Sequence, residues 1–200
     1  MARRLDEDGA TLVFLILVRH SQSRQDPARP ASQWGLTDEG RRRCEALAAR
    51  LAGLAPDLIV TSAERKAAET GALIAMRLGI AHELAAGLHE HARERVGWLA
   101  PEAFEQSIAA LFELPDELVL GEETANQACA RFSDAVQSVL GRHPQQTIAI
   151  VAHGTVITLF VAAHAHIAPI PFWKRLGMPA FAVLSLPDLK LLEVAERIEN

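Results

Sequence analysis

The chain has no tyrosine, only two cysteines and few aromatic residues, which make up 5% of its 200 residues. It also lacks a basic excess, because 20 lysines and arginines stand against 25 acidic residues and leave a formal net charge of −5. A nucleic-acid-binding protein normally carries such an excess, so nucleic acid is not the expected partner. Two cysteines are too few for a disulfide-stapled miniprotein. Half of the residues are hydrophobic, which is enough for a packed core and excludes a disordered chain.

The two cysteines, Cys44 and Cys129, lie far apart and form no C-x-x-C pair for zinc or redox chemistry. Buried free thiols are the simplest interpretation, and they favour a reducing cytoplasm. The pair Arg3-Arg4 is followed by acidic residues and only a short apolar run, so no signal peptide is expected.

A longer stretch without Asp, Glu, Lys or Arg extends over residues 143–173. Proline, glycine and histidine divide it into pieces of strand and helix length. We therefore expect these pieces to be buried in a protein core rather than to span a membrane. The sequence leaves a homodimer open.

The length predicts a single domain over residues 1–200, since about 150 residues per domain is usual. Continuous apolar runs predict buried strands, and N-cap patterns at Thr37, Thr61 and Thr124 predict helices after them. We expect strands near residues 12–18, 57–60 and 147–152, a terminal strand pair over 180–194, and helices near 38–51, 63–78, 101–113, 124–140 and 154–165. This order predicts an α/β fold, a three-layer α/β/α sandwich with a mostly parallel central sheet.

Three of the expected strands end in polar residues that suit phosphate chemistry. Arg19-His20 follows the first strand, Thr61-Ser62 the second, with Arg65-Lys66 just beyond, and His153-Gly154 the third. Ligands of such sheets bind beyond the carboxyl ends of the strands. A compact cationic pocket is therefore expected there, and a phosphoryl group, which accepts hydrogen bonds from guanidinium groups and helix N-termini, is the matching ligand.

Five motifs in order give this pocket a family resemblance. They are Arg19-His-Ser-Gln-Ser23, Leu36-Thr-Asp-Glu-Gly40, the segment from Ser62 to Thr70, Leu88-His-Glu90 and Val151-Ala-His-Gly154. Together they resemble the histidine phosphatase superfamily, also called the phosphoglycerate-mutase-like family, over core motifs within residues 12–160. The resemblance implies a phosphoglycerate-mutase-like fold and a metal-independent phosphatase without a cofactor. Its substrate would be a phosphorylated small molecule or a phosphorylated side chain.

The resemblance also implies the role of each site residue. His20 would be the nucleophile that forms a phosphohistidine, His153 would hold phosphoryl oxygens, and Glu90 would protonate the leaving oxygen and then activate water. Arg19 would hold phosphoryl oxygens as well. The further expected phosphate-binding residues are Ser23, Lys66, Arg65 and Gly154.

Two positions depart from the family pattern. Ser21 stands where the family has glycine, and its hydroxyl could add a donor to the site. Lys66 stands at the usual arginine position, with Arg65 one place earlier, and a lysine lacks the two-pronged grip of a guanidinium. Arg24, Arg93 or Arg95 could compensate, although each also fits a surface charge.

Three other functions remain open at this stage. A mutase could pass the phosphoryl group to a second hydroxyl, but few residues separate Glu90 from His153 for the closing segments of true mutases. A weakly catalytic phospho-ligand-binding protein would explain Ser21 and Lys66. A metalloenzyme could use the pairs His89-x-His91 and His164-x-His166, yet no His-Glu-x-x-His motif is present. Specificity would come from the variable region of about residues 83–125, and the aromatic residues Trp34, Trp98, Phe104 and Phe112 would line an organic subsite or pack.

Overall fold

The structure is a computed structural model that describes residues 12–199. Its centre is a six-stranded sheet in the order β3-β2-β4-β1-β5-β6. The strands are β1 (Phe14–Arg19), β2 (Leu58–Thr61), β3 (Ala81–Leu84), β4 (Ile148–Ala152), β5 (Ala180–Ser185) and β6 (Leu191–Ala195). Only β5 runs against its neighbours, so the prediction of a mostly parallel sheet is confirmed. The start of the chain, including Arg3-Arg4, lies outside the described residues.

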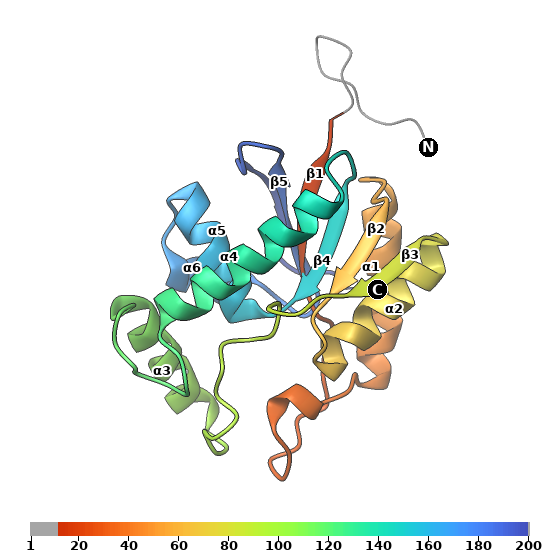
Figure 1. Cartoon of the computed structure of the whole chain (residues 1–200). Helices are drawn as coiled ribbons and strands as arrows, with labels where there is room; N and C mark the ends of the chain where they lie inside the picture. The colour runs from red at the N-terminus through yellow and green to blue at the C-terminus, as the bar shows by residue number, and fades with distance from the viewer. Residues whose placement is uncertain (1–11, 200) are drawn as a thin grey trace.

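Helices cover both faces of this sheet. They are η1 (Ala31–Gln33), α1 (Asp38–Ala52), α2 (Arg65–Leu78), α3 (Pro101–Glu113), α4 (Ala125–Arg142), α5 (Gly154–Ala165) and α6 (Pro169–Arg175). The side chains of α1 and α2 pack against one face, and those of α4, α5 and α6 against the other. In Figure 1, α4 crosses the front of the sheet and α3 lies to one side of it. The three-layer expectation is thereby confirmed.

The apolar run in β1 explains why this strand lies in the middle of the sandwich. Leu15 and Leu17 belong to the core beneath α4 and α5, while Ile16 and Val18 belong to the core beneath α1 and α2. All four side chains are fully buried. Alternate residues of a strand point to opposite faces, so a strand covered on both sides must be apolar throughout.

The N-cap patterns are confirmed at two helices and wrong at the third. The Thr37 hydroxyl accepts a hydrogen bond from the Gly40 N–H at 2.8 Å, and Thr124 forms a complete capping box. Thr61, however, is still part of β2, where its hydroxyl contacts His82 at 3.1 Å. Helix α2 starts one turn later, with Glu64 at the N-cap and no side-chain cap bond, so the Glu64 side chain is available elsewhere.

The expected variable region contains an element that the pattern did not predict. Strand β3 occupies residues 81–84, and an irregular segment then leads to α3. A small separate apolar cluster, which includes Ile108, Leu111 and Phe112, holds α3 against Trp173 and Ile170 of α6. This cluster anchors the variable region beside the carboxyl ends of the strands.

The uncharged stretch over residues 143–173 forms β4, α5 and the first part of α6. Its apolar side chains, such as Ile150, Val156 and Phe160, are buried in the sandwich. Within residues 12–199, no helix has both the length and the apolar composition to cross a membrane.

Candidate active site

The three polar strand ends of the sequence lie at one edge of the sheet. Strand β4 lies between β2 and β1 and is parallel to both. The residues that directly follow β1 and β2 still form hydrogen bonds with β4. The His20 N–H donates to the Ala152 carbonyl, and the Ser62 N–H donates to the Val151 carbonyl, both at 3.0 Å. The rings of His20 and His153 consequently lie with their centroids 5.3 Å apart and nearly edge to face.

The ring of His20 is held in one orientation by its own loop. Its Nδ1 lies 2.8 Å from the Ser21 carbonyl oxygen, which can only accept a hydrogen bond. Nδ1 therefore carries the proton, and Nε2 is the unprotonated nitrogen of the neutral ring. Burial lowers the pKa of His20 well below its ordinary value, and the charges of His153, Lys66 and Arg19 lower it further. The neutral, nucleophilic form is thus the resting form.

The second histidine, His153, is completely buried at the N-cap of α5. Its Nε2 contacts the Ser62 hydroxyl at 2.9 Å, while its Nδ1 is buried without a hydrogen-bond partner. Burial lowers the pKa of His153 well below the ordinary value, and Lys66 adds to that effect. An anion beside the ring would offset both influences and favour the protonated form.

Arg19 reaches the same place from the end of β1. One of its terminal nitrogens donates to the Leu176 carbonyl, and its Nε is buried without a partner. A Cβ at position 154 would lie only 3.0 Å from the Arg19 guanidinium, so Gly154 lets this group approach the start of α5. Burial lowers the pKa of Arg19 from its ordinary value.

Glu90 comes from the segment after β3 and sits on the N-terminus of α5. Its carboxylate accepts hydrogen bonds from the N–H groups of Thr155 at 3.2 Å and Val156 at 3.3 Å. It also lies 3.4 Å from Arg93. Burial alone would raise the pKa of Glu90, but Arg93, His153 and the backbone N–H groups lower it well below its usual range. Glu90 is therefore ionised in the free protein.

An arginine of α4, which the sequence patterns did not single out, supports the Glu90 loop. Arg131 donates to the carbonyls of Gly87 at 2.7 Å and His89 at 3.0 Å, and to that of Glu90 at 3.2 Å. It is paired with Glu123 at 2.6 Å. Arg131 belongs to no motif in the sequence, and only the packing of α4 against this loop reveals its role.

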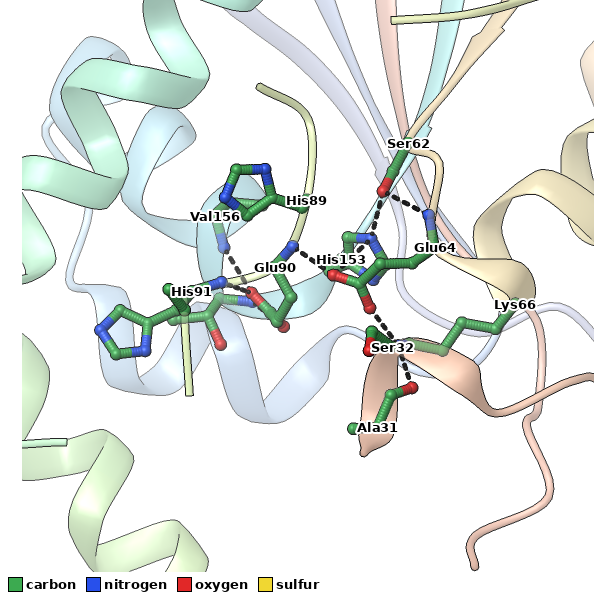
Figure 2. A network of polar contacts seen from close by, with 12 residues as sticks. Ala31, Ser32, Ser62, Glu64, Lys66, His89, Glu90, His91, His153 and Val156 are labelled. Carbon is green, nitrogen blue, oxygen red and sulfur yellow. Dashed lines mark hydrogen bonds and ion pairs between the residues drawn. The ribbon is translucent and has the colours of Figure 1, made fainter. Parts of the chain in front are cut away.

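The sequence pattern predicted that the Glu64 side chain is part of a capping box, but this side chain contacts residues of the site instead. Figure 2 shows its carboxylate between Lys66 on one side and the residues His153 and Glu90 on the other. One oxygen lies 2.5 Å from the Lys66 Nζ, and the other accepts the Glu90 N–H at 2.7 Å and lies 3.5 Å from the His153 Nε2. The Lys66 Nζ also donates to the Ala31 carbonyl at 2.8 Å. The charge of Lys66 is thus already neutralised in the free protein.

The loop after His20 accepts Ser21 without strain, because Ser21 is not among the residues with a positive φ angle between positions 12 and 199. Its hydroxyl donates to the Gly40 carbonyl at 2.7 Å, so it braces α1 and is not the extra phosphate donor that the sequence allowed. A Cβ at position 40 would lie 2.1 Å from the Gln22 carbonyl oxygen, which explains why this turn needs glycine. Ser23 forms a backbone bridge with Leu36, and its role stays a prediction.

The arginines that the sequence left open lie in three different surroundings. Arg65 and Arg24 line a cavity of about 240 Å³ whose lining includes neither His20 nor His153, so the contribution of Arg65 to a phosphate site stays a prediction. Arg95 is exposed. Arg93 is instead largely buried beside Glu90, and its guanidinium lies 5.1 Å from the centre of the Phe104 ring.

His91 and His164 each have a local partner. His91 is buried, and its Nε2 lies 2.7 Å from the Glu123 carbonyl oxygen. The ring of His164 contacts the Phe160 ring and carbonyl at the end of α5, as expected for packing. Among residues 12–199, no three His, Cys, Asp or Glu side chains gather in a group that could hold a metal ion.

The buried histidines predict how stability depends on pH. Since the pKa values of His20 and His153 are well below normal in the folded protein, only the unfolded chain protonates both rings near pH 6. The unfolded state then binds more protons, so the free energy of unfolding should fall below about pH 6.5, by up to about 1.4 kcal/mol per pH unit for each histidine. Urea denaturation between about pH 5 and 7.5 measures this slope. The double variant His20→Asn/His153→Asn should reduce this slope, although His82, His89 and His91, whose pKa values burial also lowers, still contribute to it. An unchanged slope would contradict the prediction.

Comparisons with known proteins identify the family of the chain and proteins of similar fold. The model of one family, the histidine phosphatase superfamily (branch 1), matches residues 15–187. Mycobacterial glucosyl-3-phosphoglycerate phosphatase in complex with inorganic phosphate has a similar structure, with a TM-score of 0.72, 22% sequence identity, and coverage of 93% of this chain and 98% of that chain. An Entamoeba histolytica phosphoserine phosphatase mutant in complex with phosphoserine gives a TM-score of 0.74, 16% identity, and coverage of 92% and 96%. YhfR from Bacillus stearothermophilus gives a TM-score of 0.71 and 21% sequence identity, and the match covers 90% of this chain and 94% of YhfR. No curated protein sequence matches the chain.

Proposed function

Because the chain belongs to the histidine phosphatase superfamily, we propose that it is a single-domain phosphatase that hydrolyses phosphate monoesters through a phosphohistidine on His20, without a metal ion. The observation that carries this proposal is the contact between the His20 Nδ1 and the Ser21 carbonyl, which leaves Nε2 free to attack. His153 lies next to it, and Glu90 lies at the N-terminus of the helix that His153 caps.

In the first step, the His20 Nε2 attacks phosphorus while the bond from phosphorus to the leaving oxygen breaks. Arg19 and His153 stabilise the charge on the other phosphoryl oxygens. Glu90 gives a proton to the leaving oxygen. Since Glu90 is ionised in the free protein, this proton enters with the substrate in its monoanionic form. In the second step, Glu90 accepts a proton from water as the water oxygen attacks phosphorus, and His20 regains its lone pair.

A small phosphorylated molecule is the substrate class that we favour. Two proteins of similar structure contain inorganic phosphate and phosphoserine, and one is named for a phosphorylated sugar derivative. The segment between β3 and α3 lies next to the candidate site and would contact the part of the substrate beyond the phosphoryl group. That part is the source of specificity in this proposal.

Hydrolysis of p-nitrophenyl phosphate in the presence of EDTA tests the proposal. We expect release of phosphate at an undiminished rate in EDTA, together with an acid-labile and base-stable phosphoenzyme after rapid quenching. Loss of activity in EDTA would contradict the metal-independent mechanism. Absence of both turnover and trapped phosphoenzyme, with a panel of phosphorylated metabolites as well, would contradict the phosphatase itself.

A further inference from the structure

Arg93 differs from the other arginines of the irregular segment after β3. Only 17% of its side chain is exposed, and its guanidinium is wedged between the Glu90 carboxylate at 3.4 Å and the Phe104 ring. Burial of an arginine costs free energy unless its N–H groups find partners. One terminal nitrogen of Arg93 pairs with Glu90, but the other, Nη1, is buried without any partner.

The same defect recurs in other cationic or ionisable groups nearby, among them His91, whose Nδ1 is also buried without a partner. Arg19 has a buried Nε without a partner, and His153 has a buried Nδ1 without a partner. The Arg19 guanidinium lies against Gly154, and His153 stands at the N-cap of the same helix, α5. Arg93 pairs with the Glu90 carboxylate, which accepts N–H groups of that helix, so the three side chains lie around the start of α5. Unsatisfied buried donors are rare in folded proteins and call for a ligand. An oxyanion at this helix start is the ligand that such a group of side chains and N–H groups would select.

Lys66 stands at the position where the family pattern has arginine, and its amino group already has hydrogen-bond partners. Its Nζ donates to Glu64 and to the Ala31 carbonyl, and the side chain is buried in that arrangement (Figure 2). A phosphoryl group could use the Lys66 charge only by competing with the Glu64 carboxylate. The pair therefore acts as a neutral structural unit between α2 and η1.

We propose that Arg93 supplies the second guanidinium that holds the phosphoryl group, together with Arg19, and that Lys66 serves only in the buried pair with Glu64. This inference rests on the proposed function for the identity of the ligand. The Arg93 guanidinium can keep one terminal nitrogen on Glu90 and direct Nη1 at a phosphoryl oxygen, so Arg93 replaces the guanidinium that the family pattern has at position 66. Because Arg93 pairs with Glu90, the phosphate-binding guanidinium would lie next to the proposed general acid.

Binding of inorganic phosphate, measured by calorimetry and as competitive inhibition, separates the two cations. Arg93→Met should weaken phosphate binding by about 10- to 100-fold, the loss expected for hydrogen bonds to a charged group. Arg93→Lys should lose affinity too, because it keeps the charge but not the fork. The matched control is Arg95→Met, which removes the same charge from an exposed position two residues away and should bind phosphate as the wild type does.

The double variant Glu64→Gln/Lys66→Met removes the buried pair without changing the net charge, and the amide oxygen of the new glutamine can still accept the Glu90 N–H. It should retain phosphate affinity within about threefold of the wild type, with folding verified by circular dichroism and thermal melting. Loss as large as that of Arg93→Met would overturn the proposal. Normal phosphate binding by Arg93→Met would also overturn it. If Arg93→Met raised only the KM for p-nitrophenyl phosphate, Arg93 would contact the leaving group and not the phosphoryl group, which would overturn the proposal as well.

These measurements distinguish failure of this inference from failure of the proposed function. A wild type that binds phosphate through Arg93 but hydrolyses no ester would contradict only the phosphatase proposal. A wild type that hydrolyses esters while Arg93→Met behaves like Arg95→Met would contradict only the role of Arg93. A wild type that binds no inorganic phosphate and hydrolyses no ester would contradict both.

Discussion

Replacement of His20 with alanine is expected to lower kcat for p-nitrophenyl phosphate by on the order of 10⁵- to 10⁶-fold, as removal of a covalent nucleophile does in other enzymes. The reason is that both chemical steps pass through the bond between phosphorus and the His20 Nε2. Steady-state assays and acid-quench trapping measure the loss of turnover and of phosphoenzyme together.

The control for this variant is His164→Ala. His164 is exposed at the end of α5, where its ring packs against Phe160 of the same helix, so its removal should leave kcat unchanged. Phosphate binding by His20→Ala should persist, since Arg19, His153 and Arg93 are untouched. A His20→Ala protein that still forms an acid-labile phosphoenzyme would assign the nucleophile to another residue.

Replacement of Glu90 with glutamine is expected to lower kcat by about 10²- to 10⁴-fold for a simple alkyl phosphate, the usual contribution of general acid–base catalysis. The loss should be much smaller for the step that releases p-nitrophenol, because that leaving group departs as a stable anion without a proton. The substituted side chain keeps an oxygen that can accept the N–H groups of α5, so the fold should survive. A comparison of leaving groups by single-turnover kinetics isolates this step.

Glu94→Gln provides the matched control for Glu90. Glu94 lies on the same segment but is exposed and accepts a hydrogen bond from Ser32, outside the cluster of His20 and His153. It should show wild-type rates with both kinds of ester. An equal loss in Glu90→Gln for alkyl and nitrophenyl esters at the first step would contradict the role of proton donor and assign Glu90 a purely structural role on α5.

Local sequence was enough to predict every strand of the sheet except β3, and the position of the histidines. A seven-residue apolar run has few alternatives to a strand buried on both faces, and the residue that follows such a strand must lie at the sheet edge. His20 and His153 were therefore predictable as neighbours. The expected N-caps at Thr37 and Thr124 also hold, since the hydroxyl, the helix start and the bonded N–H are within three residues of one another.

The failed cap at Thr61 shows where such local reasoning ends. Thr61-x-x-Glu64 has the form of a capping box, but pairing of β2 with β3 keeps Thr61 in the strand, in contact with His82. Glu64 is then released toward Lys66 and His153. The competing interaction is the pairing of β2 with β3, a strand about twenty residues away, and no sequence pattern around Thr61 predicts it.

The sequence by itself thus determined the α/β sandwich, the strand ends that carry the chemistry and the identity of His20, His153 and Glu90 as candidates. Only the tertiary structure decided which cations face them. Arg65 and Arg93 are chemically identical side chains, yet one lines a separate cavity and the other is buried against Glu90. The physical reason is that long charged side chains are directed by the partners they meet, and those partners come from segments distant in the chain.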